Sequence, residues 1–317
     1  MTEDARHAAW PDLPYARWKD TCATLQLWMQ VIGKVRLVQS PWLNHSWHVP
    51  FYVTARGLTT SPVAYAERIF DAEFDFIGHA LVLRASDGAT QQVALRPRTV
   101  ADFYVAVMTA LDTLRLPLRI DRIPNEIADP IAFDRDTAHA AYDADSVQRF
   151  WRILVQVDRV LTRFRTGFIG KCSPVHFFWG SFDLAVTRFS GRPAPRHPGG
   201  VPHLPDAVAR EAYSHEVSSA GFWPGGGGVD DAAFYSYTYP EPEGFRSARI
   251  RPASAFYDDA LGEFILPYDA VRTASDPDGT LLEFLQSAYE AAADAGRWDR
   301  PALECAEGRA RVPRATG

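Results

Sequence analysis

The stretch Ile169-Gly170-Lys171-Cys172-Ser173-Pro174-Val175-His176-Phe177-Phe178-Trp179 repeats the landmarks of an earlier stretch in the same order. The earlier copy reads Ile32-Gly33-Lys34, then Ser40-Pro41, His45 and Trp47, and it leads to Arg56 as the later copy leads to Arg188. Each copy follows a helical apolar pattern and leads into an aromatic run of strand type. We therefore predict an internal duplication, and the extra polar residues of the second copy make it the place to look for a site.

The residues around the first copy predict a half built from helices and antiparallel strands. Apolar spacing indicates a helix over about residues 20–34, with Gly33 as its end, and another over 101–114. Alternating runs between these helices are typical of strands, and Asp87-Gly88 is a hairpin signal. The first half therefore reads as helix, strands, helix.

The second half repeats this plan. Helical spacing predicts helices over residues 145–164 and 281–295, and alternation predicts strands over 176–188 and 211–222. Residues 191–205 are rich in Pro, Gly and His, which indicates a loop and a candidate lid. The chain has no regular β-α-β alternation and no Gly-rich phosphate loop after a first strand. We therefore predict an α+β fold of two related halves, with mostly antiparallel sheet and flanking amphipathic helices.

The boundaries of these parts follow from composition. The connector between the halves holds Pro124, Pro130 and scattered acids, but also enough apolar residues to lie against the surface. The expected parts are an N-terminal extension (1–19), a first half (20–121), the connector (122–143), a second half (144–298) and a flexible tail (299–317).

Composition excludes several classes of protein. The 317 residues are 47% hydrophobic and 23% charged, which is ordinary for a globular chain. The net charge of −6 argues against a nucleic-acid partner, and no apolar run reaches the length of a membrane span. The acidic N-terminus lacks the plan of a signal peptide, and three scattered cysteines fit reduced thiols. We expect a soluble cytoplasmic protein.

The densest group of chemically capable residues runs from Lys171 to Asp183. His176 lies among aromatic residues, where burial tunes the pKa of an imidazole, so it is a candidate acid, base or ligand. Asp183 falls on the opposite strand phase and is a candidate partner for a histidine or for Arg188. The alternative is an aromatic core strand with one hydrogen-bonded histidine. A Cys172 nucleophile activated by Lys171 and His176 is a weaker possibility.

A second group lies between Tyr213 and Trp223. Its strand phase places His215 on one face, and Glu216 and Ser218 on the other, an unusually polar pattern for a central strand. His176, His215 and Glu216 together would suit zinc, iron or manganese. However, no H-E-x-x-H spacing is present, so we assign no metal and leave the cofactor unknown.

Several long motifs resemble an uncharacterised bacterial family, domain of unknown function 5996 (DUF5996). The resemblance covers Trp10 to about Trp298 and implies one globular unit, without an activity, cofactor or catalytic residue. The motifs are Trp10-Pro11-Asp12-Leu13-Pro14-Tyr15, Asn44-His45-Ser46-Trp47-His48-Val49, Arg56-Gly57-Leu58-Thr59-Thr60-Ser61, Gly170 to Leu184, and Ser214-His215-Glu216.

These observations leave three functional hypotheses open. The first is an enzyme acting on a small polar molecule between the halves. Its candidate catalytic residues are His176, His215, Glu216 and Asp183. Its candidate substrate-binding residues are Lys171, Arg188, Trp179, Trp223 and Ser218. The second is a binding or sensor module in which the same pocket holds a small-molecule ligand without chemistry. The third is an interaction protein whose aromatic strands form a dimer surface.

Overall fold

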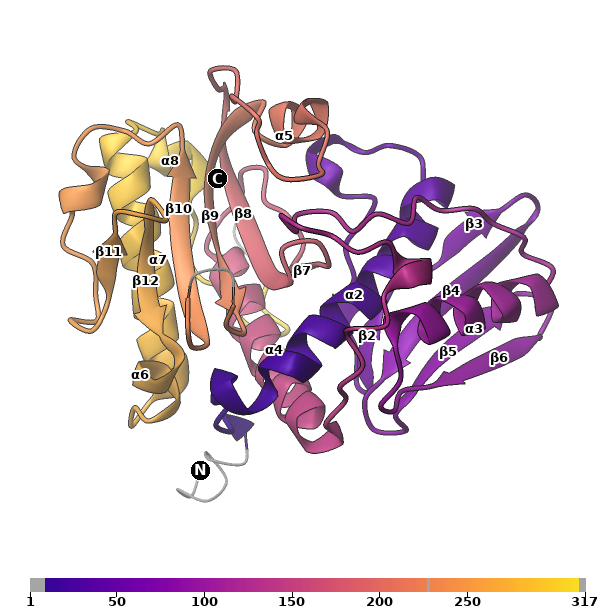
Figure 1. Ribbon diagram of the computed structural model, residues 1–317. Helices are drawn as coiled ribbons and strands as arrows, with labels where there is room; N and C mark the ends of the chain where they lie inside the picture. The colour runs from indigo at the N-terminus through magenta and orange to yellow at the C-terminus, as the bar shows by residue number, and fades with distance from the viewer. Residues whose placement is uncertain (1–8, 227–228, 314–317) are drawn as a thin grey trace.

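The computed structural model describes residues 9–226 and 229–313 (Figure 1). Two six-stranded antiparallel sheets, one from each half of the chain, are flanked by helices, which confirms the predicted α+β class. Figure 1 shows the sheets on either side of helix α2 (Tyr15–Gln39). Within the part of the chain that the structure describes, no helix is both long and apolar enough to cross a bilayer.

The first sheet has the order β1-β2-β4-β5-β6, with β3 beside β4. Its strands are β1 (Tyr52–Val53), β2 (Gly57–Thr59), β3 (Val63–Tyr65), β4 (Arg68–Asp75), β5 (Ala80–Ala85) and β6 (Thr90–Ala94). The predicted hairpin joins β5 to β6, where Gly88 has a φ of 89°. One face packs against α3 (Val100–Thr113), since the rings of Phe74 and Phe103 stack 6.5 Å apart.

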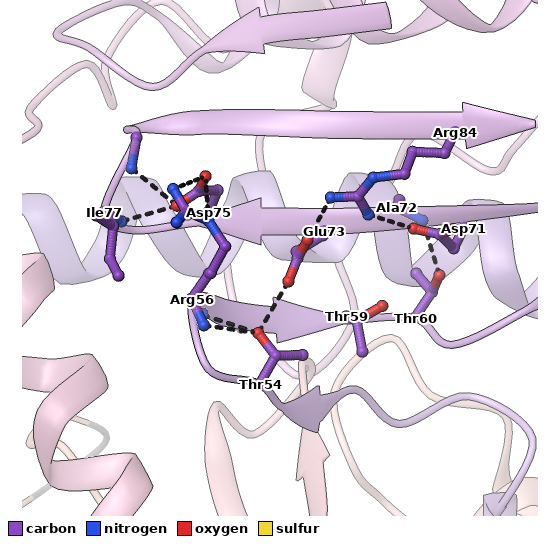
Figure 2. A network of polar contacts seen from close by, with 12 residues as sticks. Thr54, Arg56, Thr59, Thr60, Asp71, Ala72, Glu73, Asp75, Ile77 and Arg84 are labelled. Atoms are coloured by element: carbon purple, nitrogen blue, oxygen red, sulfur yellow. Dashed lines mark hydrogen bonds and ion pairs between the residues drawn. The ribbon is translucent and has the colours of Figure 1, made fainter. Parts of the chain in front are cut away.

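The other face of this sheet carries a network of ion pairs and hydrogen bonds (Figure 2). Arg84 donates hydrogen bonds to Asp71 at 2.8 Å and to Glu73 at 2.6 Å, and Arg56 donates to Asp75 at 2.6 Å. The alternation along β4 therefore places apolar residues toward the core and carboxylates toward arginines. Each of these three carboxylates is already paired with an arginine on this face.

The second sheet has the order β11-β12-β10-β9-β8-β7. Its strands are β7 (His176–Phe178), β8 (Asp183–Pro193), β9 (His215–Trp223), β10 (Ala233–Tyr239), β11 (Phe256–Asp258) and β12 (Glu263–Pro267). Helices α4 (Ala144–Thr166), α6 (Tyr268–Arg272) and α7 (Pro277–Ala295) cover one face, and α8 (Arg300–Leu303) follows α7. The predicted strand over 211–222 is wrong at its start, because α5 (Asp206–Ala212) occupies that position and β9 begins at His215.

Helix α2 differs from its prediction in length. Gly33 does not end it; the helix continues to Gln39, and Gly33 lies inside it against the indole of Trp179. A Cβ at Gly33 would lie 2.3 Å from that ring, so the glycine permits a close contact rather than a helix end.

The two sheets meet at their first strands. Phe51, next to β1, and Phe177 of β7 exchange backbone hydrogen bonds of 2.8 and 2.9 Å. Both halves thus begin with a strand at the junction and continue as antiparallel neighbours. This arrangement is what an internal duplication would produce, and common descent of the halves stays a prediction.

Candidate functional site

A cavity of about 410 Å³ lies on the face of the second sheet that is turned away from α4 and α7. Because alternate residues of a strand share a face, β8 contributes Asp183, Thr187 and Phe189, and β10 contributes Tyr235 and Tyr237. The volume falls within the range of small-molecule sites, about 300–1,000 Å³. The second half thus has an open sheet face where the first half has ion pairs.

Segments from the rest of the chain cover this face. They are the 3-10 turn η1 (Asn44–Ser46), the connector at Asn125 and Glu126, and α5 with the loop before it. Glu211 of α5 accepts a hydrogen bond from the backbone N–H of His45 at 2.9 Å, which ties α5 to η1. The cavity is therefore assembled from both halves and the connector.

Aromatic rings form much of the wall. Trp179 packs on Gly33 and its indole N–H donates to the Val49 carbonyl at 3.0 Å, so the ring is fixed in place. The other aromatic side chains at the cavity include Trp47, Phe178, Phe189, Tyr213, Tyr235 and Tyr237. Walls of this kind with a few polar groups are typical of small-ligand sites.

One end of the cavity is acidic. Asp183, at the start of β8, accepts a hydrogen bond from the Ser181 hydroxyl at 2.5 Å and another from the Tyr235 hydroxyl. Burial raises the pKa of Asp183, and these two donors partly offset that rise because they favour the ionised form. Asp183 is thus a buried carboxyl whose ionised form is opposed by burial and favoured by two hydroxyl donors.

Glu126 of the connector adds a second carboxyl at this end. Glu126 lines the cavity and is solvent-exposed; partial burial of its carboxyl, followed by the charge of the nearby Asp183, raises its pKa to about 7. Its Oε1 lies over Gly180, where an added Cβ would be 2.0 Å away. Among residues 9–226 and 229–313, no hydrogen bond or ion pair reaches this carboxyl. Glu126 thus presents to the cavity a solvated carboxyl whose acceptor positions are open to a ligand.

The position of Glu126 is fixed by its neighbours. Gln30 of α2 both donates to the Asn125 carbonyl (2.9 Å) and accepts from the Asn125 N–H (2.8 Å), while the Glu126 N–H donates to the Pro202 carbonyl at 2.9 Å. Glu126 itself has a φ of 61°, in the left-handed region that non-glycine residues rarely occupy. Such strain persists where surrounding contacts hold it, and it often occurs at functional sites.

His45 and Lys171 lie toward the far end of β8. The Lys171 ammonium is 2.7 Å from Nε2 of His45, and Nδ1 of His45 is 2.7 Å from the Ala212 carbonyl. Because an ammonium only donates, Nε2 accepts and Nδ1 carries the proton. Burial, followed by the charge of Lys171, lowers the pKa of His45, so its ring is neutral.

The structure does not bring the predicted histidines together. His176 pairs with Ala185, which pairs with Gly221, six residues from His215 on β9, so the two imidazoles do not touch and are linked through the rings of Trp47 and His45. His176 is buried beside Tyr52, and burial lowers its pKa to about 3. The ring of His215 instead lies 5.8 Å from that of His45.

Three other predicted residues lie on the opposite face of the sheet. Glu216 pairs with Arg192 at 2.6 Å, and Ser218 lies opposite Arg188 in the β8–β9 register. The Arg188 guanidinium is buried 3.5 Å from the ring centroid of Phe164 and 4.3 Å from that of Tyr289, so it does not face the cavity.

The remaining predictions divide as follows. Trp179 and Asp183 line the cavity, Lys171 contacts it through His45, and Trp223 donates to the Ser181 carbonyl at 3.2 Å from outside the lining. Burial raises the pKa of the Cys172 thiol, which argues against an activated nucleophile there. Across the described ranges, no group of three His, Cys, Asp or Glu side chains is placed to hold a metal ion.

Sequence reasoning missed Glu126, yet a signal for it was present. Gln26, Gln30 and Lys34 follow one another at four-residue spacing within the largely apolar stretch 25–35 of α2. Gln26 donates to the Gly180 carbonyl at 2.6 Å, and Lys34 donates to the Ile123 carbonyl at 2.6 Å. Such a buried polar stripe needs partners, because unpaired polar groups are costly in a core. It therefore indicates that another segment, here the connector, docks on the helix.

Comparison with known proteins gives a family and no function. A family model described as "Family of unknown function (DUF5996)" matches residues 10–305, so the chain belongs to this family, as its motifs indicated. Neither a curated protein nor a solved structure matches the chain.

Proposed function

We propose that this DUF5996 protein binds a small amphipathic molecule in the cavity between its second sheet, the connector and α5. The observation that carries the proposal is an aromatic-walled cavity of about 410 Å³ into which an unpartnered carboxyl group is held. An apolar or aromatic body would lie among the rings, and a polar group would meet Glu126, Asp183 or the hydroxyl groups of the sheet. Of the residues singled out by sequence, Asp183 and Trp179 belong to this site.

The walls supply part of the free energy of binding. Burying about 250 Å² of apolar ligand surface contributes about 6 kcal/mol before the costs of association are subtracted. Fixed rings such as Trp179 reduce those costs, because little side-chain freedom remains to be lost on binding. Because 6 kcal/mol corresponds to a Kd of about 40 μM before those costs, we expect millimolar or weaker affinity from apolar contacts alone. Polar contacts must add to it, and they decide which molecule binds.

A cavity-filling variant tests the proposal. Ala185 lies on the cavity face of β8, so Ala185→Phe would occupy the space, whereas Ala89→Phe makes the same change in the exposed β5–β6 turn. A library of small aromatic and amphipathic fragments is screened by thermal shift and by ligand-observed NMR. Hits that bind the wild type and Ala89→Phe but not Ala185→Phe support the proposal. Hits that bind all three proteins alike, or no hits at millimolar concentration, overturn it.

Acid–base catalysis on the bound molecule is the second candidate. It is favoured by Glu126, because a pKa of about 7 suits a group that both takes up and releases a proton near neutral pH. The test is conversion of a confirmed ligand by the wild type, with a rate that changes through pH 7. If Glu126→Gln converts the ligand as fast as the wild type does, the carboxyl is not the proton-transferring group.

A further inference from the structure

We infer that the polar group of the ligand is a protonated amine, seated between the carboxyl groups of Glu126 and Asp183 at the acidic end of the cavity. This inference rests on the proposed function and names the chemical class of the ligand. Three observations carry it: the pairing of two carboxyl groups, the fixed placement of the unpartnered one, and the aromatic rings around them.

The two carboxyl groups have room for additional donors. Asp183 accepts from Ser181 and Tyr235, but an ionised carboxylate offers about four acceptor positions. Glu126 has all of its positions free within the described residues. An ammonium group has up to three N–H donors and one positive charge, so a single amine can donate to both carboxylates at once.

The position of Glu126 is fixed by contacts to the backbone of Asn125 and Glu126, none of which involves the Glu126 carboxyl. Gln30 clamps both backbone groups of Asn125, and Pro202 accepts the Glu126 N–H. These contacts maintain a left-handed backbone at Glu126, which is unfavourable for a residue with a side chain. They aim the carboxyl over Gly180, where any side chain would collide with it. The arrangement presents negative charge to the cavity rather than to an internal partner.

The surroundings favour a cation over other ligand groups. A carboxylate on the ligand would be repelled by both acids, and a neutral hydroxyl would leave the buried Asp183 without a counter-charge. The rings of Phe178, Trp179 and Tyr235 line the same cavity, and aromatic faces attract ammonium groups. Lys171, a cationic side chain toward the other end, lies over Phe189, which is six residues, or about 20 Å of strand, from Asp183 along β8.

Proton linkage gives the inference a pH signature. Glu126 has a pKa raised to about 7, so it is mostly protonated at pH 5 and mostly ionised at pH 8. If the amine binds the ionised form, its affinity rises with pH by up to about 100-fold between pH 5 and pH 8, since each pH unit below the pKa reduces the ionised fraction about tenfold. A neutral ligand of the same shape gains no such increase.

The experiment compares probes that share a shape and differ in one group. The probes are 2-phenylethylamine, 2-phenylethanol and 3-phenylpropionate, measured by calorimetry and ligand-observed NMR on the full chain. In the wild type at pH 8 we expect the amine to bind at least tenfold more tightly than the alcohol. Glu126→Gln should reduce the amine to the level of the alcohol. Glu216→Gln, the same change on the opposite face of the sheet, should leave the preference intact.

The outcomes separate this inference from the proposed function. Circular dichroism first verifies that Glu126→Gln is folded, and Asp183→Asn serves as a second variant at the same end. Equal binding of alcohol and amine, blocked by Ala185→Phe, overturns the amine and keeps the cavity as a ligand site. An amine preference that survives in Glu126→Gln also overturns the inference. The absence of binding by every probe contradicts both proposals.

Discussion

Replacing Gly33 by alanine should destabilise the protein, although alanine is the better helix former. The added Cβ would lie 2.3 Å from the Trp179 ring, whereas ordinary contacts begin at 3.4 Å, so helix or ring must move by about 1.1 Å. The ring is buried and donates to the Val49 carbonyl, so it has little room to retreat. Overpacking of this kind costs about 1–3 kcal/mol, and a lost hydrogen bond about 1 kcal/mol more. The helix-propensity gain is at most about 1 kcal/mol, so we expect a net loss of about 2 kcal/mol.

Urea unfolding followed by tryptophan fluorescence measures this loss. Gly167→Ala is the matched control, because its Cβ would find no atom nearer than 3.7 Å, and its free energy of unfolding should stay within about 0.5 kcal/mol of the wild type. Trp179→Phe in the Gly33→Ala background should recover part of the loss, since a smaller ring relieves the contact. A Gly33→Ala protein as stable as the wild type would refute the packing argument.

Three further predictions concern ionisable groups whose pKa values are shifted in the folded protein. Arg188→Ala should lower the free energy of unfolding by about 3 kcal/mol. Arg188→Met, which refills the space beside the Phe164 and Tyr289 rings, should lower it by less than half as much. Equal losses in the two variants would contradict this packing argument. His176 stays neutral in the folded protein but takes up a proton below pH 6.5 in the unfolded chain, so the free energy of unfolding of the wild type falls as pH drops. His176→Phe should remove about 2 kcal/mol of that fall between pH 7 and pH 5, as measured by urea unfolding. Glu126 keeps its proton to about pH 7 when folded but loses it near pH 4.5 when unfolded, so its contribution to stability falls as pH rises through that window; Glu126→Gln should therefore raise the melting temperature more at pH 8 than at pH 5, and an equal change at both values would count against the raised pKa.

Local patterns in the sequence predicted much of the fold. The apolar spacing over residues 145–164 corresponds to α4, and the Asp87-Gly88 turn joins β5 to β6, because both depend on neighbouring residues alone. The helix end at Gly33 was wrong because the reason for that glycine, Trp179, lies far along the chain. A glycine near the end of an apolar pattern has two physical explanations, and sequence alone does not separate them.

The candidate site was predictable in part. The Lys171 to Asp183 cluster correctly singled out a region that lines the cavity, since it combines aromatic walls with a carboxyl. The sequence did not predict Glu126 as a site residue, because its position at the cavity depends on the docking of the connector on Gln30, a contact between segments about 95 residues apart. His176 attracted attention as a histidine among aromatic residues, a pattern that does not reveal which side of a strand faces open space. Its role, like the cytoplasmic location, stays a prediction.

The junction at Phe51 and Phe177 also bears on aggregation. A sheet edge with unpaired backbone groups is a template for pairing with other chains, and natural proteins cover or blunt such edges. Here the backbone pairing of Phe51 with Phe177 covers part of the edge strand of each sheet with the edge strand of the other. A half produced alone would expose the His176-Phe177-Phe178 strand, and we expect it to self-associate. Contact between the two halves therefore reduces the exposed strand edge through which either half could associate with other chains.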